Sequence, residues 1–133
     1  DCCTYTKETG HLQAISCSSD RTVRVWDLQT FKEIEQLRMD EHEDWVMSCC
    51  VYSWRGNWRA VSTSKDKTMK SWDLETGECL HTFKGHEDMV GGCEVYKRDG
   101  TNWEERARGV AGEADRALTC SDNSTLRVGN LDD

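Results

Sequence analysis

Apolar and polar residues alternate in short stretches along most of the 133-residue chain. Residues 22–26 (TVRVW) alternate with a period of two, which indicates a β-strand because successive side chains of a strand point to opposite faces. Residues 79–83 (CLHTF) follow this pattern more weakly, whereas 46–52 (VMSCCVY) form a more apolar run, typical of a strand covered on both faces. Turn sequences rich in Asp, Gly, Asn and Lys separate the stretches. The pattern predicts an all-β protein.

The predicted strands fall into three units, at residues 1–32, 33–74 and 75–133. The first unit holds a strand near Thr4–Thr6, then Leu12–Ser16 and Thr22–Leu28. The second holds Glu33–Leu37, Val46–Tyr52, Arg59–Thr63 and Thr68–Leu74. The third holds Cys79–Phe83, Val90–Tyr96, Ala117–Ser121 and Thr125–Leu131. A charged insertion at 97–116 is expected to be exposed, with one helical turn within Glu104–Ala117.

One sequence motif recurs in these units, which identifies the chain as a repeat protein. The motif is a turn Asp followed by Trp-Asp, and it stands at Asp20 with Trp26-Asp27 and, 46 residues later, at Asp66 with Trp72-Asp73. The third copy is degenerate, because Asn123 takes the Asp position and Gly129 the Trp position. A second motif at Glu41-His42 returns 44 residues later as Gly85-His86.

The Trp-Asp strand end, the Gly-His pair, the Asp turn and the spacing near 45 residues resemble the WD40 repeat, whose units are four-stranded propeller blades. The resemblance covers roughly residues 11–131 and is strongest in the second unit. It implies a single domain of about three blades of four antiparallel strands, forming an open arc or partial propeller. Propellers typically have 4–8 blades. The chain, which lacks an initial Met, is therefore expected to be a fragment of a longer propeller, one part of an assembled ring, or an arc packed against a partner.

The resemblance also implies a hydrogen-bonded tetrad of His, Ser or Thr, Asp and Trp within each blade. An imidazole between a carboxylate and a hydroxyl, with an indole N–H donating to that hydroxyl, satisfies four half-buried polar groups together. Carried over to this sequence, the second unit supplies His42, Ser62 or Ser64, Asp66 and Trp72. The first unit has Asp20 and Trp26 with no visible His, and the third has His86 with Thr119 or Ser121. We expect these residues to be structural, and the third tetrad to be broken.

Partners of the resembling family bind mostly on the face formed by the loop before the innermost strand and by the Asp turn. In this chain that face is expected to present Ser19, Trp45, Met47, Lys65, Met89, Gly91 and Asp122. Trp45 beside Met47 is the expected anchor, because a large apolar ring is ordered at modest entropic cost. Trp54, Trp58 and Trp103 lie near hairpin tips, where each either packs on its hairpin or anchors a partner.

The charge balance excludes several classes of partner. The net charge is −8, with 25 acidic and 17 basic residues, which argues against a general nucleic-acid binder or a protein of anionic membrane surfaces. No apolar run approaches the ~20 residues of a membrane span, and no signal peptide is visible. An acidic rim around the expected binding face favours partners with basic surfaces.

Catalytic and metal-binding residues are not evident in the sequence. Eight Cys without a C-x-x-C spacing are expected to be reduced thiols, in a reducing compartment such as the cytoplasm. His42 and His86 occupy equivalent places on different repeats, so they are not expected to converge on a metal, and no cofactor is predicted. Cys79 and His81 form the nearest nucleophile–base pair, but no third group accompanies them.

These observations predict a non-catalytic protein-interaction scaffold built from WD40-like repeats. The alternative is a structural subunit held permanently in a large assembly through its open blade edges, since unpaired strand edges invite pairing or aggregation. In either case further blades or a partner chain are expected to cover those edges.

Overall fold

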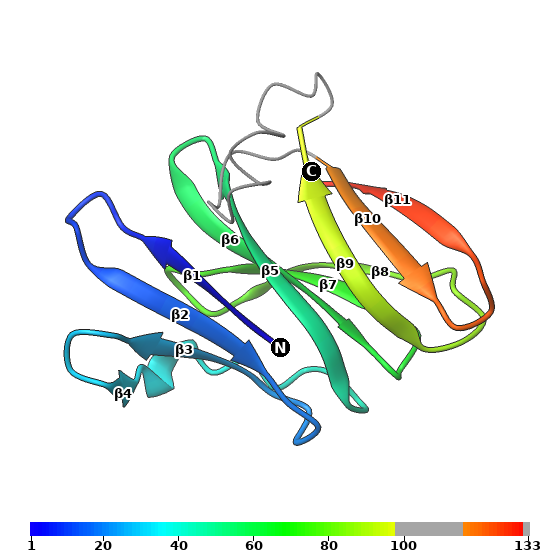
Figure 1. Cartoon of the computed structure of the whole chain (residues 1–133), viewed down its shortest axis with the longest axis horizontal. Helices are drawn as coiled ribbons and strands as arrows, with labels where there is room; N and C mark the ends of the chain where they lie inside the picture. The colour runs from blue at the N-terminus through cyan, green and yellow to red at the C-terminus, as the bar shows by residue number, and fades with distance from the viewer. Residues whose placement is uncertain (98–115, 132–133) are drawn as a thin grey trace.

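Antiparallel β-strands make up nearly all the regular structure of the computed structural model, which describes residues 1–97 and 116–131 (Figure 1). The strands are β1 (Cys2–Thr6), β2 (Leu12–Cys17), β3 (Val23–Asp27), β4 (Lys32–Glu33), β5 (Val46–Trp54), β6 (Asn57–Ser64), β7 (Met69–Asp73), β8 (Cys79–Phe83), β9 (Val90–Tyr96), β10 (Arg116–Ser121) and β11 (Leu126–Asn130). One 3-10 helix, η1 (Glu35–Leu37), follows β4. In this described part no helix is long and apolar enough to cross a membrane. The predicted all-β fold is confirmed.

The strands form three antiparallel sheets that follow one another as an open arc (Figure 1). The first sheet has the order β1-β2-β3-β4 and the second the order β5-β6-β7-β8. The third sheet, β9-β10-β11, has three strands among the described residues. The leading strands β1, β5 and β9 lie along the inner side of the arc, where β5 packs against both β1 and β9. The predicted arc of blade-like sheets is therefore present.

Sheets and sequence units are offset by one strand. We grouped Cys79–Phe83 with the third unit, but this strand, β8, pairs with β7 in the second sheet and places Phe83 opposite Met69. This grouping does not match the sheets. A tight turn after β7 brings the chain back alongside β7, and the Asp73 amide there donates to the Glu78 carbonyl at 3.0 Å.

The strand expected at Glu33–Leu37 is also wrong in extent. β4 covers only two residues, and the Leu37 amide then donates to the Ile34 carbonyl at 2.9 Å, which closes the turn of η1. Met39 follows and forms an isolated bridge with Val23. The curl buries Leu37 and Met39 against the first sheet, which a straight strand could not do. Of the insertion expected at 97–116, residues 98–115 lie outside the described part, whereas Arg116 and Ala117, at the end of the range expected to hold a helical turn, begin β10.

Apolar side chains pack between neighbouring sheets rather than around one centre. Buried side chains between the first and second sheets include Ile15, Val25, Val51 and Trp72. Those between the second and third include Tyr52, Val61, Met69, Val95, Ala117 and Leu131. Trp72 is fully buried, and aromatic rings dominate such cores because each removes about 150–250 Å² from water. Each sheet therefore depends on its neighbour for its core.

The turns after β2, β6 and β10 share one geometry because they share one residue pattern. In the second of these turns, Asp66 Oδ1 accepts hydrogen bonds from the Thr68 amide at 2.9 Å and the Thr68 hydroxyl at 2.6 Å. The residue in the middle of each turn has a positive φ, at Arg21 (72°), Lys67 (70°) and Ser124 (65°). An Asp or Asn side chain that bonds the backbone two residues on stabilises such a turn.

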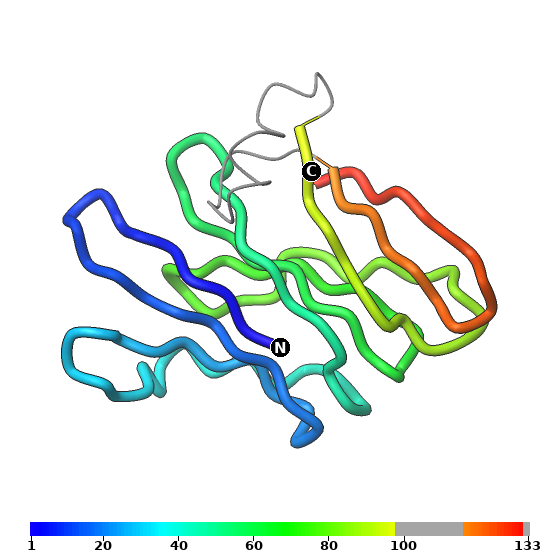
Figure 2. Tube along the Cα trace, viewed as in Figure 1, coloured from blue at the N-terminus to red at the C-terminus, as the bar shows by residue number. Residues whose placement is uncertain are grey.

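The two ends of the strands present different surfaces (Figure 2). The lower right of Figure 2 carries the β2–β3, β6–β7 and β10–β11 turns with the loops that enter β5 and β9. We call this surface the loop face, and it comprises residues 18–21, 42–47, 64–67, 86–91 and 121–124. The opposite end carries the β1–β2, β3–β4 and β5–β6 hairpins and is called the hairpin face.

Candidate functional site

Four side chains of the second sheet form a continuous hydrogen-bonded network. His42 Nδ1 lies 2.7 Å from Asp66 Oδ2, and His42 Nε2 lies 2.8 Å from Ser62 Oγ. The indole N–H of Trp72 donates to the same Ser62 oxygen at 2.8 Å. Of the two serines that the sequence left open, Ser62 makes these bonds, whereas Ser64 donates to the Asp44 carbonyl at 3.1 Å.

Burial and charge determine the protonation of this tetrad. Burial lowers the pKa of His42 below its usual 6.5, and the contact with Asp66 opposes this shift only in part. Burial raises the pKa of Asp66, but hydrogen bonds from Thr68 and His42 outweigh it and lower the pKa overall. A neutral His42 that donates from Nδ1 to Asp66 accepts at Nε2 from Ser62, whose oxygen then accepts from Trp72. Every polar hydrogen in the tetrad then has a partner.

The first sheet carries part of the same arrangement. The Trp26 indole N–H donates to Ser16 Oγ at 2.8 Å, as Trp72 does to Ser62. Asp20 accepts from the Thr22 hydroxyl at 2.7 Å and from the Arg24 guanidinium at 2.6 Å. Thr22 bonds the turn carboxylate as Thr68 does in the second sheet, and Arg24 bonds the other carboxylate oxygen, which His42 bonds in the second sheet. Ser16, which we did not single out from the sequence, occupies the position of Ser62.

The third sheet carries a His–Thr network without a Trp. His86 Nε2 lies 2.8 Å from Thr119 Oγ1, and His86 Nδ1 lies 3.1 Å from Thr125 Oγ1. Thr125 in turn donates to Asn123 Oδ1 at 2.6 Å. Of the two residues left open here, Thr119 bonds His86, whereas Ser121 donates to the Met89 carbonyl at 2.8 Å. Gly129 stands opposite Ala117, as Trp72 stands opposite Ala60.

Trp45 is the large apolar side chain exposed on the loop face, with 48% of its surface accessible. The ammonium of Lys65 lies 3.8 Å from the centre of its indole ring, a cation–π contact that fixes the ring's orientation. The Lys65 amide also donates to the Trp45 carbonyl at 2.9 Å, and the Trp45 amide donates to Asp44 Oδ1 at 2.7 Å. Trp45 is thus exposed yet held from both sides.

The remaining candidate residues lie on the same face. Met89 repeats the arrangement of Trp45, because its amide donates to Asp88 Oδ1 at 2.7 Å. Its carbonyl accepts from the Asp122 amide at 3.3 Å, which joins this loop to the β10–β11 turn. Gly91 and Ser19 are exposed, whereas Met47 is half-buried. The first and second sheets are linked here too, since the Val46 amide donates to the Ser18 carbonyl at 3.1 Å.

Ser64 and Ser121 were named from the sequence only as alternatives for the tetrads, and their role in holding these loops was missed. Ser64 and Ser121 are both buried, and each donates to the carbonyl of a loop residue, Asp44 in one case and Met89 in the other. Both stand two residues before the turn Asp or Asn, so the signal was present in the repeat alignment. Their hydroxyls fix the loops that carry Trp45 and Met89 on the edges of rigid strands.

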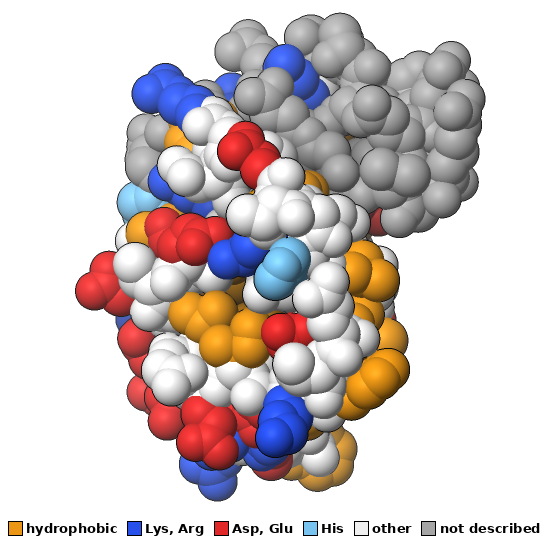
Figure 3. All heavy atoms as spheres, turned by 90° about the vertical axis from the view of Figure 1, so that its left-hand side faces the viewer, with side chains coloured by type: hydrophobic (Ala, Val, Ile, Leu, Met, Phe, Trp, Pro, Cys, Tyr) orange, Lys and Arg blue, Asp and Glu red, His pale blue; other side chains and the backbone are white. Residues whose placement is uncertain are grey.

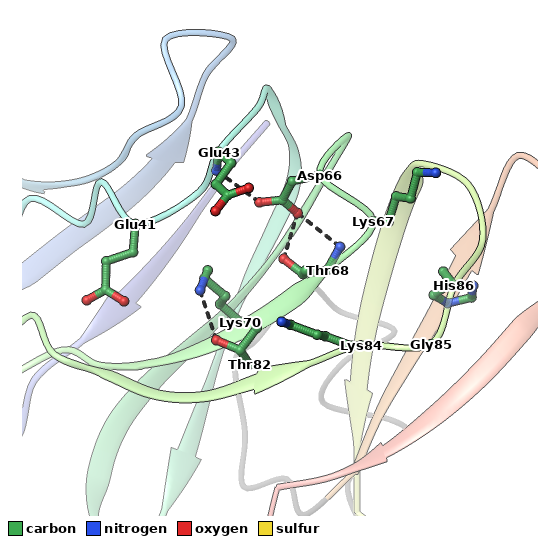
Figure 4. Close-up of a pocket in the computed structure, with 10 residues that line it drawn as sticks. All are labelled: Glu41, Glu43, Asp66, Lys67, Thr68, Lys70, Thr82, Lys84, Gly85 and His86. Atoms are coloured by element: carbon green, nitrogen blue, oxygen red, sulfur yellow. Dashed lines mark hydrogen bonds between the residues drawn. The ribbon is translucent and has the colours of Figure 1, made fainter.

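A cleft of about 430 Å³ opens over β7 and β8 of the second sheet, between the loop that enters β5 and the loop that enters β9 (Figure 4). Its charged residues have both signs: Glu41, Glu43, Asp66, Lys67, Lys70 and Lys84. The Lys70 ammonium donates to Thr82 Oγ1 at 2.8 Å, and the Glu43 amide donates to Asp66 at 3.1 Å. Figure 4 shows the glutamates at one side of the cleft and Gly85 with His86 at the other. Of the tetrad, Asp66 alone lines the cleft.

The hairpin face differs from the loop face in composition. In Figure 3, which views the left-hand side of Figure 1, acidic, basic and apolar side chains are interspersed over the part that the structure describes. Trp58 near this end packs against Tyr5 with a ring separation of 5.2 Å. The guanidinium groups of Arg55 and Arg59 lie 5.0 and 5.6 Å from the ring centre of Trp54. Both rings are half-buried in intramolecular contacts, and Trp103 lies outside the described residues.

The nearest nucleophile–base pair in the sequence, Cys79 with His81, lies in β8. The Cys79 thiol bonds to the backbone oxygen of His81 at 3.6 Å, and burial raises the pKa of this thiol, which disfavours the nucleophilic thiolate. None of the eight Cys forms a disulfide. In residues 1–97 and 116–131 no three His, Cys, Asp or Glu side chains are grouped to hold a metal ion.

Comparison with known proteins agrees with this architecture. The family model described as "WD domain, G-beta repeat" matches residues 2–27, 33–73 and 77–128. A solved structure described as "Structure of U3-55K" is similar over 95% of this chain, with a TM-score of 0.68 and 20% sequence identity. The chain spans only 32% of that protein's length, and the likeness is one of fold. No curated protein matches the chain at a significant level.

Proposed function

The chain belongs to the WD40 repeat family, and we propose that it acts as a non-catalytic protein-interaction scaffold that binds through its loop face. The observation that carries this proposal is the state of Trp45, which is exposed but oriented by Lys65 and Asp44. An aromatic ring ordered before binding loses little conformational entropy when a partner covers it. Trp45 is therefore the proposed anchor of the interface.

The surroundings of Trp45 suit a partner with basic residues. Most exposed charged residues of the loop face are acidic: Asp20, Glu43, Glu87, Asp88 and Asp122. Arg21 and Lys67 are exposed there too, but they are fewer. Charges on the rim of an interface contribute more to association rate and specificity than to affinity. We therefore expect the partner to approach with a basic surface and to bind faster at low salt.

Affinity capture with matched variants tests this function. Trp45→Ser removes the anchor from the loop face, and Phe31→Ser removes an 84%-exposed ring from the hairpin face as the control. Proteins captured by the wild type are expected to be lost selectively by Trp45→Ser and retained by Phe31→Ser. Equal retention by both variants would contradict the proposed site.

A structural subunit held by an open blade edge is the second candidate. The observation that favours it is β11, on which Leu126 and Val128 are 67% and 60% exposed beside the edge of the third sheet. Apolar side chains on an open edge favour pairing with another chain. Light scattering separates the two functions, because a scaffold stays a defined species when purified alone, whereas a subunit dependent on that edge aggregates until its partner is added.

A further inference from the structure

The three sheets offer an internal comparison at one position of the third strand. Trp26 in β3 and Trp72 in β7 each donate an indole N–H to a serine of the neighbouring strand, at 2.8 Å in both cases. In β11 this position is Gly129, which stands opposite Ala117 just as Trp26 and Trp72 stand opposite alanines. The acceptor is retained, because Thr119 takes the place of Ser16 and Ser62 in the register.

A cavity of about 230 Å³ is present where the third indole would lie. It is lined by Met69, Phe83, Lys84, His86, Thr119, Arg127, Val128 and Gly129. A Cβ on Gly129 would meet the Met69 methyl at 3.1 Å, closer than ordinary van der Waals contact, and Phe83 at 3.6 Å, so a side chain at 129 requires the flexible end of Met69 to move by a few tenths of an ångström. An apolar cavity of about 150 Å³ holds a benzene molecule, so this one has room for a two-ring heterocycle.

The hydroxyl of Thr119 is an acceptor that lacks an N–H donor. Thr125 donates to Asn123, so it accepts from His86 Nδ1–H, and His86 Nε2 then accepts the Thr119 proton at 2.8 Å. The Thr119 hydroxyl has a second, longer contact as donor to the Arg127 carbonyl, at 3.4 Å. With His86 Nε2 unprotonated, no N–H group of residues 1–97 or 116–131 donates to the Thr119 oxygen, which keeps its lone pairs. Its counterpart Ser62 also bonds a His Nε2 atom, that of His42, and it accepts the indole N–H of Trp72 as well.

The charges at the cavity select an anionic ligand. Lys84 and Arg127 line it and are exposed, and no acidic side chain is among its lining residues. The Arg127 guanidinium lies over Gly85, 3.1 Å from where a Cβ would stand, so a larger residue at 85 would displace it. His86 adds no charge at neutral pH, because burial and then the nearby Arg127 lower its pKa. A guanidinium and an ammonium at the rim of a cavity with apolar walls at Met69, Phe83 and Val128 suit a carboxylate.

We propose that this cavity binds a small indole carboxylate, with the ring between Met69 and Phe83, the ring N–H donated to Thr119 Oγ1, and the carboxylate near Arg127 and Lys84. The ligand supplies the ring that the repeat has lost at Gly129. The cavity lies between the second and third sheets and shares only His86 with the loop face, so it contains none of the residues expected to contact the loop-face partner.

Titration of the isotope-labelled chain with indole-3-acetate, followed by NMR, tests the site. Saturable shifts are expected at the amides of Met69, Phe83, Thr119 and Gly129. Gly129→Trp fills the cavity with its own ring and should abolish these shifts, whereas Cys120→Ser, at an exposed position of the same sheet outside the cavity, should bind as the wild type does. Equal binding by wild type and Gly129→Trp, or no saturable shift in the wild type, would overturn the proposal.

Two Thr119 variants keep the test valid should Gly129→Trp fail to fold. Thr119→Ser restores the residue of the other sheets and should retain binding, whereas Thr119→Val removes the acceptor and should weaken binding about tenfold. Naphthalene-1-acetate, which lacks the N–H, should bind the wild type more weakly than indole-3-acetate does. The two compounds should bind Thr119→Val with equal affinity. N-acetyltryptophanamide carries the ring without a carboxylate. If it binds more tightly than indole-3-acetate, the proposal of a small indole carboxylate is overturned, and the cavity instead receives a tryptophan side chain of a partner protein.

Discussion

Removing the hydroxyl of Ser62 tests the tetrad at its central atom. Ser62 Oγ joins His42 Nε2 and Trp72 Nε1, each at 2.8 Å, and Ser62 is fully buried. Ser62→Ala removes one oxygen without creating a large cavity, but it leaves an imidazole nitrogen and an indole N–H without partners. Neither group can turn to water, because His42 and Trp72 are buried as well.

The expected loss follows from these two orphaned groups. A buried polar group deprived of its partner costs about 1–3 kcal/mol, so two such groups cost roughly 3 kcal/mol in all. With an m-value of about 2 kcal/mol/M for urea, the unfolding midpoint of Ser62→Ala should fall by about 1.5 M. Urea unfolding followed by circular dichroism measures this shift directly.

Ser16→Ala in the first sheet is the matched control. Ser16 accepts the Trp26 indole at the same 2.8 Å, but both residues are only half-buried. Water can replace the lost hydroxyl there, so the cost should be about 1 kcal/mol and the midpoint shift about 0.5 M. Equal shifts in the two variants, or a shift below about 0.5 M in Ser62→Ala, would refute the reasoning that burial of the tetrad makes it stabilising.

Three further predictions concern pH, thiol oxidation and Gly129. Because burial lowers the pKa of His42 below 6.5, the unfolded chain binds that proton more readily, so stability is full above about pH 6.5 and declines as the pH falls below it. The urea midpoint should therefore be lower at about pH 5 than at about pH 7.5. The difference between the two pH values should be smaller in His42→Gln, and the part that remains comes from His86, whose pKa is also lowered. An equal difference in His42→Gln and the wild type would contradict this. The Cys50 and Cys93 sulfurs lie 3.5 Å apart across β5 and β9, so diamide should oxidise them to a disulfide that peptide mapping detects and Cys93→Ser abolishes; oxidation confined to the exposed Cys2 and Cys120 would count against it. Without ligand, Gly129→Trp should raise the urea midpoint by at least about 0.5 M, because it buries an indole between Met69 and Phe83; a lower midpoint would mean that the cavity cannot hold the ring.

Much of the fold could be predicted from the sequence because its signals are local. The alternation over Thr22–Leu28 and the turn at Asp66 each specify a short segment, and β3 and the β6–β7 turn lie where these signals put them. The extent of β4 could not be predicted in this way. Glu33–Leu37 alternates well enough for a strand, but the burial of Leu37 and Met39 against the first sheet bends the chain instead.

The site was less predictable because it depends on pairing between strands. The motif supplied His42 and Trp72, but only the register of β6 against β7 distinguishes Ser62 from Ser64. The placement of β8 in the second sheet could not be predicted for the same reason, because the repeat motif does not specify which neighbouring strand β8 pairs with. The cavity at Gly129 could not be predicted at all, because it depends on how the second and third sheets pack, with Met69 and Phe83 on one side and Thr119 on the other.

Site-specific photo-crosslinking tests the proposed loop-face interaction most directly. A benzoylphenylalanine placed at position 45 replaces the proposed anchor with a reactive ring, and the same residue at position 31 samples the exposed ring of the hairpin face. Irradiation in cell extract should link position 45 to a discrete protein. Arg21→Glu and Lys67→Glu make the loop face more acidic, so they should not remove this adduct from a partner with a basic surface. Position 31 should not give the adduct. The same adducts at both positions, or none at position 45, would contradict an interaction face centred on Trp45.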